Sequence, residues 1–326
     1  YTDIQAYLCE QKELGVILAI NSKNDERNVT IGLQKKESVL SAKDFSSIKA
    51  NWNPKSQNMR EIALDLKLGS DSFVFLDDNP GEREEVRLYD SKIGIPELSK
   101  PEYYIQEIDR AGYFECIGIS NEDRMRGKMY AEAELRGKNQ HHYSNYDDFL
   151  QSLEMKAEIG SFSSQYYSRI AQLTNKSNQF NLTTKRCSRA DIEEIAQKEN
   201  FITLYGKLSD KFGDNGLVSV IFGHIDADKV TFHIDEWLMS CRVLKRDLEK
   251  AMMDILYRQC LNRGVKTILG YYYRTDKNEM VKEHYREMGF LLFEDKGDST
   301  VWKYDVTTDY VNKNTHILVE EVKGNE

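Results

Sequence analysis

The stretch SFVFLDDNPGEREEVR, Ser72–Arg87, decides how the first half of the chain is interpreted. Its first five residues, Ser72–Leu76, are mostly apolar and are typical of a buried strand. Two carboxylates follow at once, Asp77 and Asp78, and the turn Asn79–Gly81 then leads into an acidic helical segment. Adjacent carboxylates at the mouth of a buried strand indicate either a turn with a helix N-cap or a metal-binding site.

Strands and helices alternate on both sides of this stretch, which predicts an α/β domain with a parallel sheet and right-handed crossovers. A helix over Ile4–Leu14 ends at Gly15, and the apolar run Val16–Ser22 is typical of a strand buried on both faces. Helical spacing then runs from about Pro54 to Gly69. A short strand over residues 92–98 and a helix over residues 101–111 complete this half.

The second half has a different order: strand, two helices, an antiparallel meander of three strands, a long helix over Leu244–Arg263, then strand, helix and two strands. A charged helix over Asn121–Lys138 separates the halves. We therefore predict a first α/β domain over residues 1–118, a helical connector over 119–150, a mixed α/β domain over 151–306 and a loosely held polar tail over 307–326.

Composition narrows the function classes. The 326 residues carry a formal net charge of −9, which argues against a nucleic-acid partner but leaves anionic small substrates open. The five cysteines form neither a disulfide framework nor a zinc-ribbon spacing, so a reducing cytoplasm is the expected setting. No apolar run reaches the roughly 18–20 residues of a membrane span, and no membrane partner is expected.

Polar side chains at strand ends suggest phosphate chemistry in the first half, because ligands of open parallel sheets bind there. Ser22 ends one strand, with Asn24 close behind it, and Lys55 opens the next helix. Asp77 and Asp78 can hold Mg²⁺, while Lys55 offers a point charge to phosphoryl oxygens. The alternatives are a turn serine, a solvated lysine and a capping aspartate pair.

The motifs LAINSKND, NWNPKSQN and FVFLDDNPGEREEVR resemble the later motifs of the haloacid dehalogenase (HAD) superfamily of phosphotransferases, and more closely its FkbH-like branch. The resemblance extends through FECIGISNEDRMRGKMY, LTNKSNQFNLTTKR, FGDNGLVSV and DEWLMSCRVL, from about Gln5 to Phe290. It implies that Ser22 hydrogen-bonds the transferring phosphoryl group and that Lys55 stabilises its charge. Asp77 and Asp78 would bind Mg²⁺, the implied cofactor.

The resemblance also implies a nucleophilic aspartate on a first strand, in a DxDxT motif, which does not occur before or around Asp3 in this sequence. We expect that strand to lie upstream of Tyr1 in the native protein. The front of the sequence, which opens on a helix rather than a strand, fits the same expectation.

The second half resembles the GNAT acyltransferase fold, in which backbone N–H groups at the start of the long helix cradle the CoA pyrophosphate through an R/Q-x-x-G-x-G/A signature. The matching positions here are Arg242–Asp247, and both small residues are replaced, by Lys245 and Asp247. With Arg246, Lys245 offsets part of the loss. Ordinary CoA binding is therefore doubtful, whereas the phosphopantetheine arm of an acyl carrier protein remains compatible.

Cys241, directly before Arg242, is a candidate acyl relay, because a basic neighbour and a helix start favour the thiolate; the alternative is an inert core cysteine. His224 and His233 have no evident carboxylate partner and are interpreted as structural. The loop Asn175–Arg186 suits either a polar ligand or loop capping.

Together these features predict Mg²⁺-dependent removal of phosphate from an acyl phosphate or other phosphorylated metabolite. The resemblance couples that step to transfer of a glyceryl-like acyl group onto a carrier-protein thiol. One alternative is a plain HAD phosphatase with a degenerate GNAT-like domain, acting in surface-glycan or secondary metabolism. Another is a non-catalytic scaffold.

Overall fold

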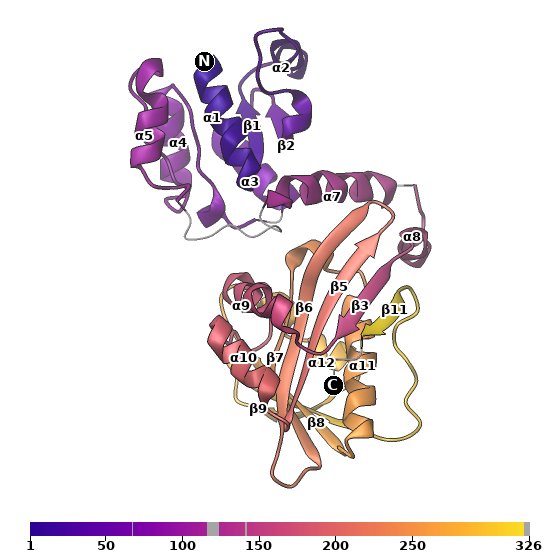
Figure 1. Ribbon diagram of the computed structural model, residues 1–326. Coiled ribbons are helices and arrows are strands. Elements are labelled where there is room, and N and C mark those ends of the chain that lie inside the picture. Colours follow the sequence, from indigo (N-terminus) through magenta and orange to yellow (C-terminus); the bar gives the residue numbers. More distant parts are fainter. Residues whose placement is uncertain (67, 116–123, 141, 323–326) are drawn as a thin grey trace. The chain divides into compact units, whose positions relative to one another are not determined.

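The structure is a computed structural model that describes residues 1–66, 68–115, 124–140 and 142–322 (Figure 1). The chain divides into two compact units, Tyr1–Leu135 and Arg136–Glu326. Each unit is described by itself. The predicted charged helix is present as α7 (Arg126–Gln140); residues 121–123 of the prediction lie outside the described residues.

Unit 1 alternates helices and strands, as the sequence predicts. Its elements are α1 (Thr2–Glu13), β1 (Leu18–Ser22), α2 (Glu26–Leu33), β2 (Phe45–Ala50), α3 (Lys55–Leu66), α4 (Pro80–Tyr89) and α5 (Tyr104–Arg110). Helix α1 ends just before Gly15, whose φ of 97° is a conformation that glycine adopts at no steric cost. Helix α2 and strand β2 were not predicted, because their polar residues give no clear hydrophobic period.

The sheet of unit 1 is parallel, with β1 paired to β2. The predicted strand Ser72–Leu76 is shorter than expected. Val74 forms a single parallel bridge with Gly94, through Phe75 N–H to Gly94 O at 2.8 Å and Gly94 N–H to Phe73 O at 2.9 Å. Because a 3₁₀ turn occupies residues 70–72, the extended segment is confined to the few residues before the aspartate pair.

Two small clusters form the core of unit 1 within the described residues. One joins α3, the bridge segment and α4 through Met59, Phe75, Val86 and Ile93. The other packs α5 against α1 and the end of the bridge segment, around Tyr104 and Ile108. Both clusters therefore anchor the short segment that carries Asp77 and Asp78.

Unit 2 contains the predicted order of strand, two helices, meander, long helix, strand, helix and two strands. The elements are α8 (Tyr146–Ser152), β3 (Lys156–Gly160), α9 (Tyr167–Lys176), β4 (Phe180–Asn181), α10 (Arg189–Gln197), β5 (Phe201–Asp210), β6 (Gly213–Ile225), β7 (Thr231–Met239), α11 (Leu248–Asn262), β8 (Thr267–Tyr273), α12 (His284–Glu287), β9 (Leu291–Asp295), β10 (Ser299–Asp305) and β11 (Leu318–Val322).

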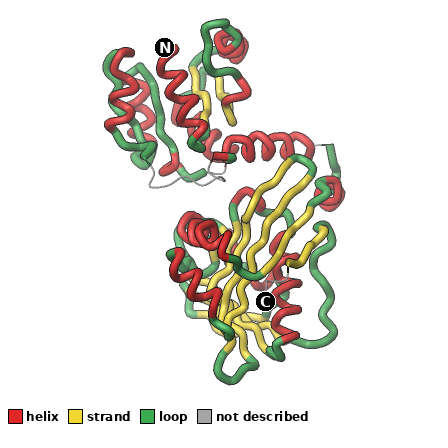
Figure 2. Tube along the Cα trace, viewed as in Figure 1, coloured by secondary structure: helices red, strands yellow, loops and turns green. Residues whose placement is uncertain are grey.

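The strands of unit 2 form one mixed sheet in the order β11-β3-β5-β6-β7-β8-β10-β9, with β4 paired to β7 (Figure 2). β7 and β8 are parallel, as are β11 and β3, and the other pairs are antiparallel. The predicted fold class is confirmed: both units are α/β, the first with a parallel sheet and the second with a mixed one.

Helices cover both faces of this sheet (Figure 1). A large cluster packs α11 against one face and includes Trp237 and Tyr257, while a second cluster packs α9 and α10 against the other and includes Phe222. Side chains alternate between faces along each strand, so a residue's neighbours on its strand indicate its face.

Over the described residues 307–322, the C-terminal segment is not a loose tail, which corrects the prediction for this part of the chain. Strand β11 pairs in parallel with β3. The segment before it is fixed by Asp254, whose carboxylate accepts hydrogen bonds from the Tyr310 hydroxyl at 2.6 Å and from the Lys313 and Asn314 amides at 2.9 and 3.0 Å. A buried acceptor on α11, 56 residues before Tyr310 in the chain, gives no local sequence signal, and the polar composition of the segment therefore misled the prediction.

None of the helices that the structure describes is long and apolar enough to cross a membrane.

Candidate functional site

Lys55 and Asp77, predicted to act together, are in contact. Lys55 is the first residue of α3, and its side chain is only 8% exposed. Its Nζ lies 3.0 Å from Asp77 Oδ2 and donates a second hydrogen bond to Asn21 O at 2.6 Å. A lysine this buried needs a paired carboxylate, so the solvated alternative is wrong. We call Ser22, Lys55, Asp77 and Asp78 the strand-end site.

A buried asparagine network holds the elements around Lys55, and the sequence analysis missed it. Asn21 Nδ2 donates to Lys55 O at 2.9 Å, and Asn58 Nδ2 donates to Asn21 Oδ1 and to Asn51 Oδ1, each at 3.0 Å. Asn58 is fully buried. The network ties the ends of β1 and β2 to the start of α3. Its signal in the sequence is Asn21 itself, a polar residue inside an apolar strand.

The aspartate pair is not the cap of α4. Asn79 takes that place, since its Oδ1 accepts the Gly81 N–H at 2.8 Å. Asp77 Oδ1 accepts the Asn79 N–H at 2.9 Å, and Arg83 donates to the main-chain oxygens of Asp77 and Asp78 at 2.8 and 3.3 Å. The main chain and the Asp77 carboxylate are thus oriented, while the Asp78 side chain is exposed.

These carboxylates have the chemistry that a Mg²⁺ ion requires. Each carboxylate has about four lone-pair positions, and the two contacts of Asp77 use only part of its capacity. Asp78 adds a second set of oxygens at the solvent side. Two hard oxygen donors on adjacent residues, one oriented and one accessible, fit Mg²⁺, which usually takes one or two protein carboxylates and keeps several waters.

Ser22 and Asn24 occupy the end of β1. Ser22 is half-buried, and its main-chain oxygen accepts the Asn51 N–H at 3.0 Å, next to the Asn21 carbonyl that Lys55 contacts. Asn24 Oδ1 accepts from the Asp25 amide at 2.8 Å and from the Asn28 side chain at 3.0 Å. The amide of Asn24 therefore organises the start of α2, and its predicted phosphate contact is untested.

In unit 2, the segment before α11 keeps an unusual backbone. The predicted helix start at Leu244 is four residues early, because a 3₁₀ turn over Cys241–Val243 is followed by Lys245 and Asp247 with φ of 62° and 63°. These are the two positions at which the GNAT signature has small residues. We call Arg242–Asp247 the helix-start loop. Its left-handed conformations cost roughly 1–2 kcal/mol at each non-glycine residue.

The charged side chains of the helix-start loop have specific partners. Arg246 is buried and donates to Asp210 Oδ2 at 2.9 Å and to Arg242 O at 2.9 Å. Burial, together with the charge of Arg136 on the same Asp210, lowers the pKa of Arg246 to about 10. Arg246 is therefore part of a structural ion-pair group, whereas Lys245 is exposed and Arg242 is half-buried.

Asp247, the carboxylate directly before α11, is itself paired. Its Oδ2 lies 2.9 Å from His316 Nδ1 and 3.0 Å from Lys250 Nζ. Tyr146 donates from its hydroxyl to Lys245 O at 2.6 Å. The loop is thus held by hydrogen bonds and ion pairs to other residues of unit 2.

Cys241 differs from the buried cysteines of unit 2. It is half-buried at the first position of the 3₁₀ turn, after Ser240. Burial raises the pKa of Cys187 to about 11 and raises that of Cys260 further, so these thiols are inert near neutral pH. The position of Cys241 is compatible with the predicted relay. Cys116 lies outside the described residues.

Near the centre of unit 2, buried polar groups form a cluster that the sequence analysis did not single out. Glu236 is fully buried, and burial raises its pKa to about 7; its Oε2 accepts the Lys185 N–H at 2.8 Å. His284 contacts the Trp237 ring, and burial alone lowers its pKa to about 3. In the described chain, Glu236 Oε1, Trp237 Nε1, His284 Nε2 and the Tyr285 hydroxyl have no hydrogen-bond partner. A buried carboxyl that titrates near neutrality is a candidate general base.

The polar loop Asn175–Arg186 makes internal contacts of the loop-capping kind. Asn181 Oδ1 accepts the Thr184 N–H at 2.6 Å, and Asn278 Nδ2 donates to Asn181 O at 2.8 Å. Arg186 donates to the main-chain oxygens of Thr174 and Ser177. These contacts favour the capping interpretation over a ligand site.

No protein-family model matches the chain, and the search of curated proteins found no match. A solved structure of the N-terminal part of a Bacteroides fragilis protein, containing a phosphatase domain complexed with Mg, shares 36% identity with a TM-score of 0.36. That match covers 36% of this chain and 32% of the other, so the chain spans about a third of that structure.

Solved structures of acetyltransferases are also similar to part of this chain. One of the GNAT family from Streptococcus pneumoniae shares 12% identity, covers 47% of this chain and 100% of its own, and has a TM-score of 0.38. The PaiA N-acetyltransferase from Thermoplasma acidophilum, in complex with coenzyme A, shares 16% identity over 46% and 99%, with a TM-score of 0.34. Because these TM-scores are low, the fold rests on the strand order and pairing of this chain.

Proposed function

We propose that unit 1 binds the phosphoryl group of a small metabolite in a Mg²⁺-dependent manner, as a HAD-type phosphatase or phosphotransferase. The observation that carries the proposal is the buried contact of Lys55 Nζ with Asp77 Oδ2 at 3.0 Å. It joins residues 22 positions apart at the end of a parallel sheet, where ligands of such sheets bind. The motif resemblance around Ser22, Lys55 and Asp77 supports the same reaction class.

Each residue has a role that follows from its chemistry. The Ser22 hydroxyl donates a hydrogen bond to a phosphoryl oxygen, and Lys55 stabilises the negative charge that develops there. Asp77 and Asp78 would hold Mg²⁺, which when bound offsets further phosphoryl charge. We assign no nucleophile among these residues; they position the phosphoryl group and stabilise its charge.

We further propose that the substrate is an acyl phosphate and that unit 2 passes its acyl group to a carrier-protein thiol. The Cys241 thiolate would attack the carbonyl carbon, the phosphate would leave with the C–O electron pair, and the carrier thiol would then displace Cys241. Support comes from the half-buried position of Cys241 at the first residue of a helical turn.

A second candidate is a phosphatase whose unit 2 selects the substrate without acyl transfer. It is favoured by the side chains of Lys245 and Asp247, which stand where a nucleotide-binding loop has small residues. A scaffold without catalysis is the third candidate. The buried Lys55–Asp77 pair weighs against the scaffold, because such a pair seldom increases stability over an apolar pair of the same size.

Binding of inorganic phosphate, measured by isothermal titration calorimetry with and without Mg²⁺, tests the phosphoryl site. The wild-type chain should bind phosphate more tightly with Mg²⁺, and Lys55→Met should abolish that binding. The matched control is Lys23→Met, which removes an exposed lysine paired with Glu82 in the same unit. Equal phosphate binding by wild type and Lys55→Met would contradict the proposal.

The acyl step is tested with a three-carbon acyl phosphate and a holo carrier protein. We expect release of phosphate and a gain of acyl mass on the carrier, measured by intact-protein mass spectrometry. Cys241→Ala should stop the mass gain, whereas Cys9→Ala, a half-buried cysteine of unit 1, should not. Phosphate release with no mass gain in the wild type would select the phosphatase alternative.

A further inference from the structure

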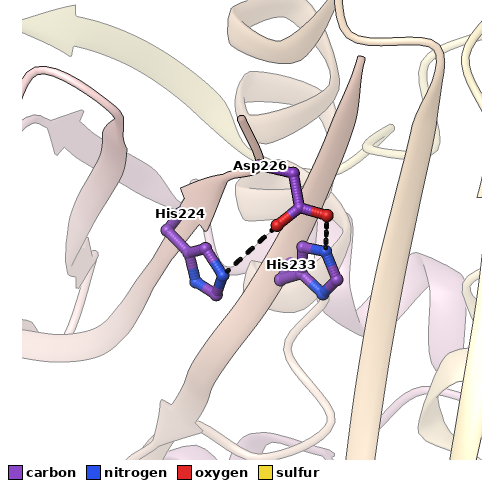
Figure 3. A group of neighbouring side chains, drawn as sticks. All are labelled: His224, Asp226 and His233. Atoms are coloured by element: carbon purple, nitrogen blue, oxygen red, sulfur yellow. Dashed lines mark hydrogen bonds and ion pairs between the residues drawn. The ribbon is translucent and has the colours of Figure 1, made fainter. Parts of the chain in front are cut away.

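Two histidines and a carboxylate meet at the β6–β7 hairpin of unit 2 (Figure 3). His224 is at the end of β6, His233 is at the start of β7, and Asp226 lies in the turn between them. His224 and His233 are cross-strand partners in the sheet register. Both histidines were interpreted as structural and without carboxylate partners; the structure gives His224 two, Asp226 and Asp235, and gives His233 one, Asp226.

The inner nitrogens of both rings face the same carboxylate. His233 Nε2 lies 2.9 Å from Asp226 Oδ2, and His224 Nε2 lies 3.9 Å from Asp226 Oδ1. One ligand atom from each of the three residues falls within 4.8 Å of the others. Tetrahedral coordination at the usual Zn²⁺ bond lengths needs ligand atoms about 3.3 Å apart, a value between the two observed distances.

The outer nitrogens of both rings are held by other groups. His224 Nδ1 lies 3.0 and 3.1 Å from the two oxygens of Asp235, and His233 Nδ1 lies 2.6 Å from the Tyr271 hydroxyl. A carboxylate or similar polar group on the second nitrogen is the usual arrangement of a metal-binding histidine, because it selects the tautomer that leaves the first nitrogen free to coordinate.

The position of Asp235 depends on a β-bulge. The register between β6 and β7 shifts where Phe222 and Gly223 pair with Glu236 and Ile234, so Asp235 is the extra residue of the bulge. Bulges re-aim side chains and are frequent next to functional sites.

The hairpin is held by contacts that do not use the three candidate ligands' side chains. Asp226 N–H donates to Thr231 O at 2.9 Å, and Lys229 N–H donates to Asp226 O at 2.9 Å. The Asp228 carboxylate accepts the Val230 and Thr231 amides at 2.9 and 3.2 Å. The backbone of the hairpin is therefore held without a metal, so that only side chains have to adjust when one binds, which lowers the cost of ordering the site.

We propose that His224 Nε2, Asp226 and His233 Nε2 form a Zn²⁺ site with the fourth position open to solvent. Two imidazoles and one carboxylate are a ligand set of zinc, whereas Mg²⁺ and Ca²⁺ take oxygen ligands. The partial exposure of His224 and Asp226 leaves room for a water or a substrate oxygen. The two rings are stacked within 6° of parallel, so coordination requires a χ2 rotation that brings both lone pairs onto the ion.

This site is independent of the proposed phosphoryl and acyl sites. It uses residues of unit 2 alone. His233 and Met239 are at opposite ends of β7, roughly 20 Å apart at the usual rise per residue, and the helix-start loop follows Met239. A zinc ion here would therefore brace the hairpin or bind a ligand at the end of the sheet away from Cys241.

The experiment is zinc binding to the full chain after treatment with EDTA, followed by competition with a chromogenic chelator. We expect one saturable Zn²⁺ equivalent in the wild type. His233→Gln and Asp226→Asn should weaken binding by at least about 100-fold, and Asp235→Asn and Tyr271→Phe by roughly 10- to 100-fold, since they remove outer-shell partners. A purely structural hydrogen-bond cluster would not bind the ion in any of these proteins.

Two controls keep the outcomes distinct. His142→Gln changes an exposed histidine of the same unit, and Asp77→Asn changes the predicted Mg²⁺ site; both should keep the zinc equivalent. Asp226→Asn leaves the main-chain bonds of the turn in place, so circular dichroism should match that of the wild type. A wild type with no saturable zinc, or equal zinc affinity in His233→Gln, would overturn the proposal.

Discussion

The strand-end site and the helix-start loop match the expected sites in different ways, the first through its side chains and the second through its backbone conformation. In the first, the side chains of the motifs that carry the resemblance are present, although the nucleophile it implies is not among them, and Lys55 and Asp77 meet at 3.0 Å. In the second, the side chains have changed, but Lys245 and Asp247 keep the left-handed backbone that glycine would adopt easily. The difference teaches that a site can keep its chemistry through side chains or its shape through the main chain, and that either feature alone is incomplete evidence of activity.

The largest expected effect comes from breaking the buried pair of the strand-end site. Lys55→Met leaves Asp77 without its cation and removes the bond to Asn21 O, so we expect unit 1 to lose about 3 kcal/mol of stability. Hydrogen exchange of α3 amides in increasing urea measures the loss within that unit. A loss too small to detect would mean that Asp77 is stabilised by other groups and that the pair is incidental.

Glu236 contrasts with Asp77, because it is a buried carboxyl with no ion pair to a lysine or arginine among the described residues. Burial raises its pKa from 4.5 to about 7, so the native state holds a proton that the unfolded state has released between these pH values. Stability must then fall as pH rises through that window, by about 3 kcal/mol in full. Glu236→Gln should therefore stabilise unit 2 at pH 8, by about 2 kcal/mol after the cost of a buried amide, and should not stabilise it at pH 4.5.

The same pH series separates Glu236 from His284. Burial lowers the pKa of His284 from 6.5 to about 3, so its contribution to stability is complete above pH 6.5 and is lost as pH falls towards 3. Between pH 4.5 and 6.5 the two groups act in opposite directions. Burial also raises the pKa of Glu249 to about 7, so two carboxyls oppose His284 in this range. Urea titrations should therefore show a wild type whose stability falls as pH rises and a nearly flat Glu236→Gln. An equally steep fall in the variant would refute the shift assigned to Glu236.

A smaller effect tests the helix-start loop. Lys245→Gly should stabilise unit 2 by roughly 0.5–1 kcal/mol, because relief of the left-handed strain exceeds the added freedom of glycine in the unfolded chain. Calorimetric melting measures this change. The double variant Lys245→Gly, Asp247→Gly should also gain CoA affinity over the wild type, measured by titration calorimetry. Unchanged CoA binding would show that the loop shape is not a remnant of a nucleotide site.

The smallest effect is expected at Lys23, which forms an exposed pair with Glu82 beside the strand-end site. Lys23→Met should leave the free energy of unfolding of unit 1 unchanged within error, because solvent screens such pairs. The same urea and hydrogen-exchange measurement serves as the control for Lys55→Met. A comparable loss in both variants would indicate a general charge effect and not the buried contact.

Local patterns were sufficient for most of the element order. Helix α1 with its glycine stop, strand β1, and the meander of β5, β6 and β7 follow hydrophobic period and turn residues. The same reasoning failed for β2 and β11, whose polar or half-exposed residues become strands because a neighbouring strand supplies hydrogen bonds. Whether such a segment pairs depends on the neighbouring strand, so the residues of the segment alone do not predict it.

By itself, the sequence determined which chemical groups the candidate sites contain and the order in which the elements occur, since both are local properties. Only the tertiary structure decided that Lys55 is buried against Asp77, that Lys245 and Asp247 are left-handed, and that His224, Asp226 and His233 converge. Each of these depends on strand register, burial or packing between separate elements. These contributions to the free energy arise from contacts between distant parts of the chain, and no local residue pattern predicts them.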